Sequence, residues 1–314
     1  MKSGFVFVPG AVLPATAGER VDILLYTAPD PKEKQEVVER LSLDPHELES
    51  ALDADEISRV DFSADCVSMI WKQPKNVSIA EQLRFDVGSM GLFLHQDRLI
   101  VIVGEDAPSF TAREFQRCGS AEDVLLKLLE QTIRHYLGHL KVIKQITAEL
   151  GTKITGSMDN QYLLQMLVLG ESLIYYINAI EANSGVLAKL EAHAPRLQLN
   201  PSQIATLHDL TVDNQQCARQ ARIYSDVVAG LMDARGTILN NNVSVLLKKL
   251  TLISIIFLPL NLIASIGGMS EFSMMTQGID WRIAYSLFGI AMVTLGWGSW
   301  HGLVRVLEKR QRRK

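Results

Sequence analysis

A row of oxygen-bearing side chains lies within the most apolar stretch of the sequence, Leu250 to Met269. Ser254 and Asn261 are seven residues apart, so two helical turns would place them on one face. Leu258 falls between them, and Ser265 extends the row by four residues. Such oxygen atoms accept hydrogen bonds from water. The row predicts a water-filled lumen, although hydrogen bonds between helices would need the same residue types.

Two uncharged runs, Leu250 to Met269 and Ile283 to Val304, are long enough to cross a membrane, since a bilayer core needs about 20 helical residues. Lys248 and Lys249 precede the first run, whereas the connecting segment holds only Arg282 as a basic residue. The segment after the second run is basic and contains Arg305, Lys309, Arg310, Arg312, Arg313 and Lys314. The positive-inside rule therefore predicts both termini in the cytoplasm, at a bacterial-type inner (plasma) membrane.

The part of the chain before the spans is acidic. The net charge is −4 over 314 residues; residues 305–314 contribute +5 and residues 247–304 contribute +1, which leaves −10 for residues 1–246. Nucleic acid is therefore not an expected partner, because phosphate binding needs a basic surface. An acidic domain can concentrate cations, and a merely solvated acidic surface fits equally well. Pro9 and Pro14 interrupt the apolar runs of the N-terminus, so we expect no secretory leader and a cytoplasmic position for residues 1–246.

Motifs of enzymes and metal centres are weak or missing in the sequence. There is no phosphate-binding loop, dinucleotide glycine pattern or nucleophile elbow, so we expect no enzyme activity, no required cofactor and passive ion movement unless protons are coupled. The cysteines Cys66, Cys118 and Cys217 have no paired ligand spacing. His135 and His139 could form a zinc pair on one helix face, but HYLGH lacks the glutamate of a zincin helix, and a polar face is the favoured interpretation.

The sequence changes character at about residue 120. Residues 1–119 predict a cytoplasmic α/β domain, with strands in ERVDILLY, ISRVDF, CVSMIWK and DRLIVIV and helices in PKEKQEVVERL and PHELESAL. Asp44 as N-cap and Pro45 at the first position provide a start for the second helix. Residues 120–246 predict a stalk of long helices, in which Ser120 caps the first helix and GTKITGS breaks it.

The last stalk helix is expected to continue into the membrane. No proline occurs between Pro201 and Pro259, so a helix of roughly 65 residues, about 100 Å at 1.5 Å per residue, is predicted. The last part of this helix, residues 247–269, would be the first membrane helix. An external loop at residues 270–282, a second membrane helix at residues 283–304 and a basic cytoplasmic tail at residues 305–314 would follow it. Such a stalk would expose an apolar stripe, so neighbouring helices or subunits are expected.

The stretch LKKLTLISIIFLPLNLIASIGGMS resembles the first membrane helix of the CorA family of divalent-cation transporters, whose pattern runs Met-Lys-x-Leu-Thr, Ile-Phe-x-Pro and Gly-Met-Asn. The matching residues are Lys248, Leu250, Thr251, Ile256, Phe257, Pro259, Ile263, Gly268 and Met269. Upstream, LDPHELESALDADEISRVDF resembles an N-terminal stretch of the family. The chain departs from the pattern at Ser270, where the family has asparagine, which suggests a divergent member near the zinc-transporting branch.

The resemblance implies a funnel-shaped homopentamer, with α/β domains in the cytoplasm, a ring of stalk helices, and a two-helix transmembrane hairpin whose first helices line one pore. The implied lumen residues are Ser244, Leu247, Thr251, Ser254, Leu258, Asn261, Ser265 and Gly268. Leu247 and Leu258 would form apolar rings able to close the pore by losing water, although plain packing would explain either residue. Counting back from the Gly-Met motif places the family's regulatory acid on the stalk at Asp209, with Asp213 one turn on as the alternative.

The filter implied by the resemblance is the segment Gly268, Met269, Ser270 and Glu271. A serine hydroxyl can accept hydrogen bonds from a hydrated cation, but it is shorter than an asparagine amide, so we expect weaker discrimination or a different preferred ion. Glu271 would add carboxylates that raise the local cation concentration. The segment from Ser270 to Arg282 also lacks the family's usual Met-Pro-Glu-Leu.

Three functions remain open from the sequence. The first is a Mg²⁺ channel that cytosolic cation closes. The second is a Zn²⁺ transporter or a weakly selective pathway for Zn²⁺, Co²⁺, Ni²⁺ and Cd²⁺, with or without proton coupling. The third is a membrane-anchored cytosolic sensor without transport, which the polar row on one face disfavours, because a tether has no need of it.

Overall fold

The computed structural model describes residues 1–8, 11–16, 20–41, 43–63, 66–76, 84–95, 98–156, 161–275 and 277–311. The chain forms two compact units, Met1–Asp233 and Ala234–Lys314, which are described separately. The first unit holds the sheet, and the second holds the C-terminal helices.

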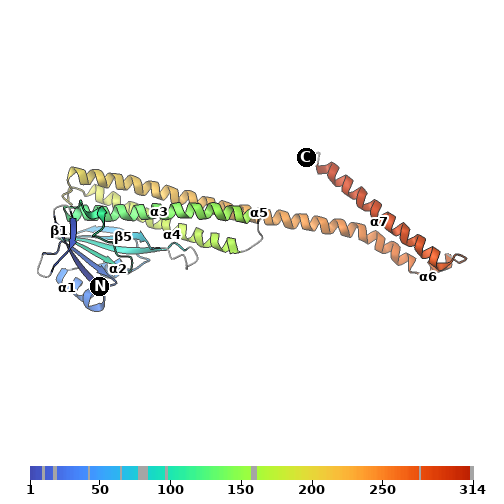
Figure 1. Ribbon diagram of the computed structural model, residues 1–314, viewed down its shortest axis with the longest axis horizontal. Helices are drawn as coiled ribbons and strands as arrows, with labels where there is room; N and C mark the ends of the chain where they lie inside the picture. Colours follow the sequence, from blue (N-terminus) through green and yellow to red (C-terminus); the bar gives the residue numbers. More distant parts are fainter. Residues whose placement is uncertain are drawn as a thin grey trace. The chain divides into compact units, whose positions relative to one another are not determined.

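The first unit is built on a seven-stranded sheet of order β2-β1-β3-β7-β6-β5-β4 (Figure 1). The strands are β1 (Lys2–Val8), β2 (Ala11–Pro14), β3 (Ile23–Thr27), β4 (Arg59–Phe62), β5 (Cys66–Pro74), β6 (Val87–His95) and β7 (Arg98–Val103). All neighbours are antiparallel except β3 and β7, which run parallel with Ile23 opposite Leu99. The carboxyl ends of these two strands therefore meet at one edge of the sheet.

Helices cover both faces of the sheet. On one face lie α1 (Pro31–Leu41) and α2 (Pro45–Leu52), whose Val37, Leu48 and Ala51 share a core with Phe93. As predicted, Asp44 caps α2, because its carboxylate accepts a hydrogen bond from the N–H of His46 at 2.9 Å. On the other face lie α3 (Ala121–Gly156) and α4 (Gln161–Ala192) (Figure 1). The 3₁₀ turn η1 (Arg113–Phe115) precedes α3.

A buried asparagine joins α4 to the sheet. The side-chain oxygen of Asn183 accepts from the backbone N–H of Lys72 at 3.0 Å, and its NH₂ donates to the Lys72 carbonyl at 2.8 Å. The Ser58 hydroxyl donates to the same side-chain oxygen at 2.7 Å. Asn183 is fully buried, so these bonds satisfy amide atoms that would otherwise be costly to remove from water.

The prediction that the segment GTKITGS, residues 151–157, breaks the first long helix is confirmed, although the break comes near the end of that segment. Helix α3 continues through Gly151 and ends at Gly156. A methyl group at Gly151 would lie 3.5 Å from a methyl carbon of Leu231 on α5, so the neighbouring helix packs over the first residue of the segment. Tertiary packing of this kind outweighs the low helix propensity of glycine and threonine.

Helix α5 (Pro201–Gly267) is continuous for 67 residues and passes through Pro259, as the spacing of prolines predicts. In the second unit, α6 (Ser270–Met275) and α7 (Trp281–Gln311) follow it. By length and composition, α4, α5 and the Trp281–Gly302 part of α7 are each apolar enough to cross a membrane. The apolar residues Leu173, Tyr176 and Ile180 of α4 are buried in the core of the first unit. Most apolar side chains of α7 are instead exposed.

Gly91 on β6 provides a test of the packing between α2 and the sheet. A Cβ atom at Gly91 would lie 2.5 Å from the Cβ of Ala51, closer than two carbon atoms can approach. We expect Gly91→Ala to lower the free energy of unfolding by about 1–3 kcal/mol, because α2 must move away from the sheet. The matched control is Gly138→Ala on α3, where nothing lies within 4 Å. Denaturant unfolding of both variants should show a lower free energy of unfolding for Gly91→Ala only.

Candidate functional site

The predicted pore residues of α5 lie on the face of the helix that α7 leaves uncovered. Ile256, Leu260 and Gly267 lie on the side toward α7, and Ile256 is only 7% exposed. Leu258 comes two residues after Ile256, so it lies about 200° around the helix from Ile256, and it is 74% exposed. Leu247 shares its face and is 58% exposed. The remaining predicted lumen residues are also exposed, namely Ser244, Thr251, Ser254, Asn261, Ser265 and Gly268.

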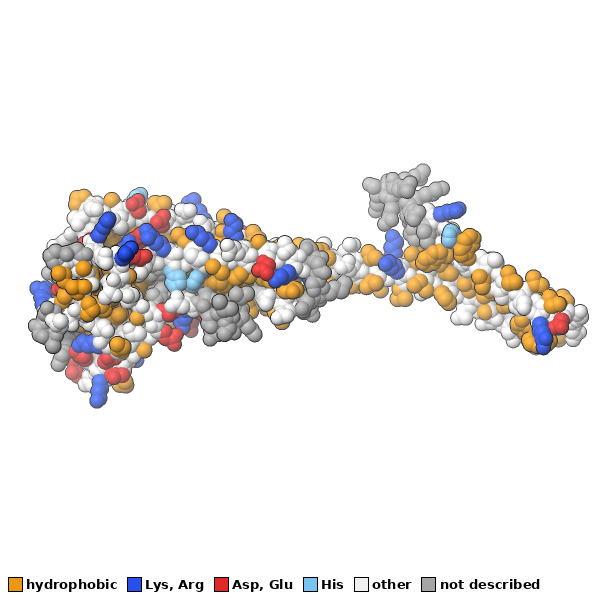
Figure 2. Space-filling model, in the orientation of Figure 1, with side chains coloured by type: hydrophobic (Ala, Val, Ile, Leu, Met, Phe, Trp, Pro, Cys, Tyr) orange, Lys and Arg blue, Asp and Glu red, His pale blue; other side chains and the backbone are white. Residues whose placement is uncertain are grey.

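Two glycines allow close contact between α5 and α7. A Cβ atom at Gly267 would lie 2.5 Å from the Phe288 ring, and one at Gly296 would lie 3.3 Å from a Leu260 methyl carbon. Beside this contact is an apolar groove of about 640 Å³ between the two helices. Asn261, one of the predicted lumen residues, also lines this groove. Figure 2 shows hydrophobic side chains over the surface of this unit.

The hydroxyl groups on the exposed face donate hydrogen bonds to their own helix. Ser244 donates to the Asn240 carbonyl at 2.8 Å, Thr251 to the Leu247 carbonyl at 2.9 Å, and Ser254 to the Leu250 carbonyl at 3.0 Å. A hydroxyl that donates in this way keeps its oxygen lone pairs for an incoming donor. The row can therefore accept hydrogen bonds from the water molecules around a cation.

The Gly-Met-Ser motif marks the end of α5 and the start of α6. The N–H of Gly268 donates to the Ala264 carbonyl at 3.1 Å, and α6 begins at Ser270, which is exposed. The chain turns at Gly268, where the N–H of Met269 donates to the Ile266 carbonyl at 3.1 Å. Neither Gly267 nor Gly268 has a positive φ, which among the described glycines occurs only at Gly278, +109°. Gly267 accommodates the ring of Phe288. The side chain of Glu271 lies outside what the structure describes.

The predicted regulatory acids, Asp209 and Asp213, are one helical turn apart and both exposed on α5. The neighbouring positions Leu207, Leu210 and Asn214 are buried against the rest of the unit, so the two carboxylates face outward. No group of three His, Cys, Asp or Glu side chains able to hold a metal occurs in the described ranges. A cation at these acids would therefore need further ligands from water or another chain.

Comparison with known proteins identifies the chain. A family described as "CorA-like Mg2+ transporter protein" matches residues 19–303, which is most of the sequence. The chain belongs to this family. Its members are membrane proteins that transport divalent cations, and this chain has helices that are long and apolar enough to cross a membrane.

Individual CorA-like relatives support the same conclusion. The cobalt/magnesium transport protein CorA of Methanocaldococcus jannaschii is 23% identical over 252 residues, covering 77% of this chain and 78% of its own. The complete structure of that organism's CorA magnesium transporter has a TM-score of 0.74, at 18% identity, and covers 96% of this chain and 95% of its own. The ZntB cytoplasmic domain of Vibrio parahaemolyticus has a TM-score of 0.59, at 14% identity, and covers 76% and 98%. The two structures establish the fold.

The histidine pair of this CorA-like chain lies in a packed cluster, not on a solvated face. The imidazole rings of His135 and His139 are 4.4 Å apart, and Nδ1 of His139 lies 2.6 Å from the hydroxyl oxygen of Tyr176. Phe85 packs edge-on against His139. Burial, with a smaller contribution from the neighbouring His135, lowers the pKa of His139 to about 4. The pair is thus held neutral at physiological pH.

We expect the stability of the first unit, Met1–Asp233, to fall as the pH drops from about 6.5 to 4. In this window the unfolded chain binds a proton at His139 while the folded chain does not, so acid favours unfolding. After allowance for solvent screening of this half-buried ring, the effect is on the order of 1 kcal/mol, or about 2–4 °C in the unfolding midpoint. His139→Gln should flatten this pH dependence, and His46→Gln on the exposed surface of α2 should leave it unchanged.

Proposed function

We propose that this CorA-like protein is a passive channel for divalent cations, with Mg²⁺ as the default ion, closed by cation binding on the cytosolic side. The observation that carries the proposal is the polar row of α5 on the face opposite α7. Five copies in the bilayer, with α5 innermost, would surround one lumen with these residues. Both termini would then lie in the cytoplasm, and the negative-inside potential of the inner membrane would drive entry.

The lumen residues suit an ion that keeps its water. Mg²⁺ sheds its hydration shell reluctantly, so a pathway of acceptor oxygens can guide the hydrated ion without stripping it. Hydroxyls such as those of Thr251 and Ser254, which donate to their own helix, offer such oxygens. Rings of Leu247 and Leu258 would interrupt the wet path and hold it closed when the pore narrows.

Regulation would occur between subunits. Asp209 and Asp213 face away from their own unit, and the described part of one chain supplies no third ligand, so a second copy would complete the site. A bound Mg²⁺ would neutralise repulsion between these carboxylates and favour the arrangement that holds the stalks together.

A Zn²⁺ transporter or weakly selective divalent pathway, with or without proton coupling, is the second candidate. Ser270 favours it, because five serines leave a wider ring with shorter ligands than five asparagines would. The likeness to the ZntB cytoplasmic domain concerns only the fold, at 14% identity, and does not bear on the choice of ion.

Transport by the purified full-length protein in liposomes, followed with dyes for Mg²⁺ and Zn²⁺, tests the proposal. Flux should be measured at equal and unequal pH, with the potential negative inside. Mg²⁺ entry that does not require a pH gradient is the expected result. Zn²⁺ flux without Mg²⁺ flux would favour the second candidate, and a lack of flux for any divalent cation would leave a membrane-anchored sensor as the better interpretation.

Ser270→Asn tests the role of the filter. Restoring the longer amide should sharpen the preference for Mg²⁺ over Zn²⁺ by about three- to tenfold, because an amide oxygen reaches further toward the pore axis. The measurement is the ratio of the two fluxes in the same liposomes. Ser286→Asn, at an exposed position of α7, is the matched control and should leave the ratio unchanged. An unaltered ratio in Ser270→Asn would mean that the ring does not discriminate.

A further inference from the structure

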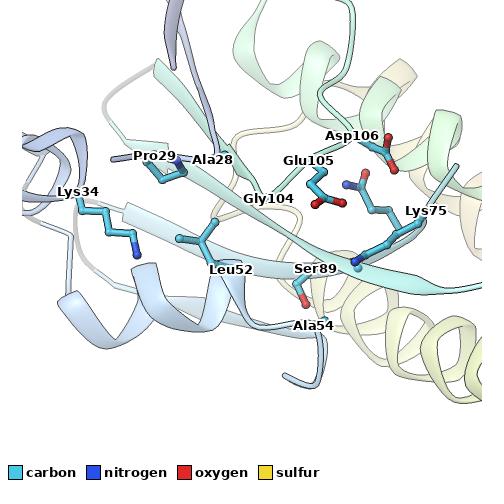
Figure 3. Close-up of a pocket in the computed structure, with 12 residues that line it drawn as sticks. Ala28, Pro29, Lys34, Leu52, Ala54, Lys75, Ser89, Gly104, Glu105 and Asp106 are labelled. Atoms are coloured by element: carbon cyan, nitrogen blue, oxygen red, sulfur yellow. The ribbon is translucent and has the colours of Figure 1, made fainter. Parts of the chain in front are cut away.

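The cytoplasmic unit contains a pocket of about 390 Å³ at the carboxyl ends of β3 and β7 (Figure 3). Its volume falls within the range of about 300–1,000 Å³ that is usual for small-molecule sites. In α/β sheets, ligands commonly bind outside the carboxyl ends of parallel strands, and β3 and β7 are the parallel pair of this sheet. The pocket lies wholly within Met1–Asp233, so it is independent of the proposed ion pathway.

Two lysines from different elements point into the pocket. Lys34 comes from α1 and Lys75 follows β5, and Figure 3 shows their ammonium groups extending from opposite sides. Both side chains are half-buried, yet neither forms a hydrogen bond or ion pair with any residue in the described ranges. Half-buried lysines without a carboxylate partner favour an anionic ligand, because they leave two positive charges to be neutralised.

A third ammonium group lies behind the floor of the pocket. Lys72 is only 7% exposed, and its Nζ donates to the hydroxyl of Ser89 at 3.0 Å and to the Ala54 carbonyl. Ser89 and Ala54 both line the pocket. The Ser89 hydroxyl in turn donates to the Asp53 carbonyl, so the floor is a fixed polar surface joined to a buried cation. The carboxylates of Asp53, Asp55 and Glu56 also lie near this ammonium group and offset part of its charge, so its main contribution is to hold the polar floor in place.

The backbone keeps the pocket open. Gly104 follows β7, and a Cβ atom there would meet nothing within 4 Å, so any larger side chain would extend into empty space. Ala28 follows β3 with a φ of +41°, a left-handed conformation that is uncommon for residues other than glycine. Its N–H donates to the Val103 carbonyl at 2.9 Å, which fixes the rim at the end of both strands. Such backbone strain is often found where a ligand is held.

The acidic residues of the pocket differ in their roles. Asp106 accepts hydrogen bonds from the backbone N–H and the side chain of Asn76, at 3.0 and 2.7 Å, so it holds the chain after β5. The exposed carboxylate of Glu105 has no such partner among the described residues and extends into the pocket (Figure 3). A carboxylate in this position can accept hydrogen bonds from hydroxyl groups, as an acidic residue does from ribose in dinucleotide-binding folds.

We propose that this pocket binds a phosphate ester of a small hydroxylated molecule, a nucleotide or a sugar phosphate. Lys34 and Lys75 carry two positive charges, which neutralise the two negative charges of the phosphate group. Glu105 accepts hydrogen bonds from the hydroxyl groups of the sugar. Gly104 provides the space that the ligand fills.

Calorimetric titration of the full-length protein in detergent, without divalent cations, tests this site. The ligands are AMP, ribose 5-phosphate, inorganic phosphate and adenosine. We expect at least one ester to bind with a submillimolar Kd, which corresponds to a binding free energy of about −4 kcal/mol or more favourable. The ester should bind more tightly than inorganic phosphate, and adenosine should not bind. AMP and ribose 5-phosphate distinguish a nucleotide site from a sugar phosphate site.

Variants of the pocket assign the contacts. Lys34→Met and Lys75→Met should each weaken ester binding at least about tenfold, whereas the exposed Lys32→Met on α1 should have no effect. Glu105→Gln should weaken the ester but not inorganic phosphate, and Gly104→Val should block both by filling the pocket. Unchanged unfolding midpoints without ligand would confirm that the variants fold. Absence of ester binding up to about 10 mM, equal binding of adenosine or inorganic phosphate, or full affinity in both lysine variants would overturn the proposal.

Discussion

Leu258→Ser should raise Mg²⁺ flux through the protein at least about tenfold under conditions that keep the wild type closed, a change of about 1.4 kcal/mol in the barrier. Leu258 is 74% exposed on the face opposite α7, where five copies would form an apolar ring. A closed apolar ring resists ions because water leaves it, and a ring of hydroxyls remains wet. The measurement is the initial rate of dye response in liposomes that contain Mg²⁺ on the cytosolic side.

The control for Leu258 is Ile253→Ser. Ile253 is also exposed and lies in the same apolar run, but it is about 140° around the helix from Leu258, toward α7. A hydroxyl there would face lipid or a neighbouring helix, so flux should stay at the wild-type level. Equal gains in the two variants would indicate a general loosening of the helices, and no gain in Leu258→Ser would remove Leu258 from the gate.

The double variant Asp209→Asn, Asp213→Asn should lose closure by cytosolic Mg²⁺. Both carboxylates are exposed one turn apart on α5, and their replacement removes two charges from each copy without a change in size. Ligand charge is a main determinant of cation affinity, so the Mg²⁺ concentration that halves the flux should rise at least about tenfold. Flux measured over a series of internal Mg²⁺ concentrations gives this value directly.

Asp226→Asn is the matched control for the regulatory acids. Asp226 is exposed on the same helix, and its replacement removes one charge from each copy at a position where no site is expected. Its inhibition curve should coincide with that of the wild type. An identical shift in Asp226→Asn would mean that the overall charge of the helix, not a site at Asp209 and Asp213, controls closure.

The fold of the first unit, Met1–Asp233, could be predicted only in part. Helices α1 and α2 begin and end where their sequences predict, and β4 and β7 lie within the predicted stretches. Strands β3 and β5 begin within theirs and extend beyond them, to Thr27 and Pro74. Strands β1, β2 and β6 were not predicted. The sequence of β6, VGSMGLFLH, is buried along most of its length, so it lacks the alternation of apolar and polar residues that identifies a half-exposed strand.

The shared exposed face of α5 was easier to predict than the pocket, for a physical reason. The residues of the α5 face occur at helical spacing in one continuous segment, so local periodicity places them together. The pocket residues Lys34, Lys75 and Glu105 come from three separate segments, which only the pairing of β3 with β7 and the packing of α1 bring together. The contact of Gly267 with Phe288 depends likewise on tertiary packing, and no local pattern indicates it.

The amide of Asn183 has a consequence for how the sheet ends. Lys72 lies on β5 beyond the last residue that pairs with β4, and in an antiparallel strand its N–H and C=O point to the same side. Asn183 bonds to both groups, as the peptide unit of an adjacent strand would. One side chain thus closes this length of edge against strand addition, the route by which exposed edges recruit other chains into aggregates. Copies of the protein can crowd together in a membrane without their sheets fusing at this edge.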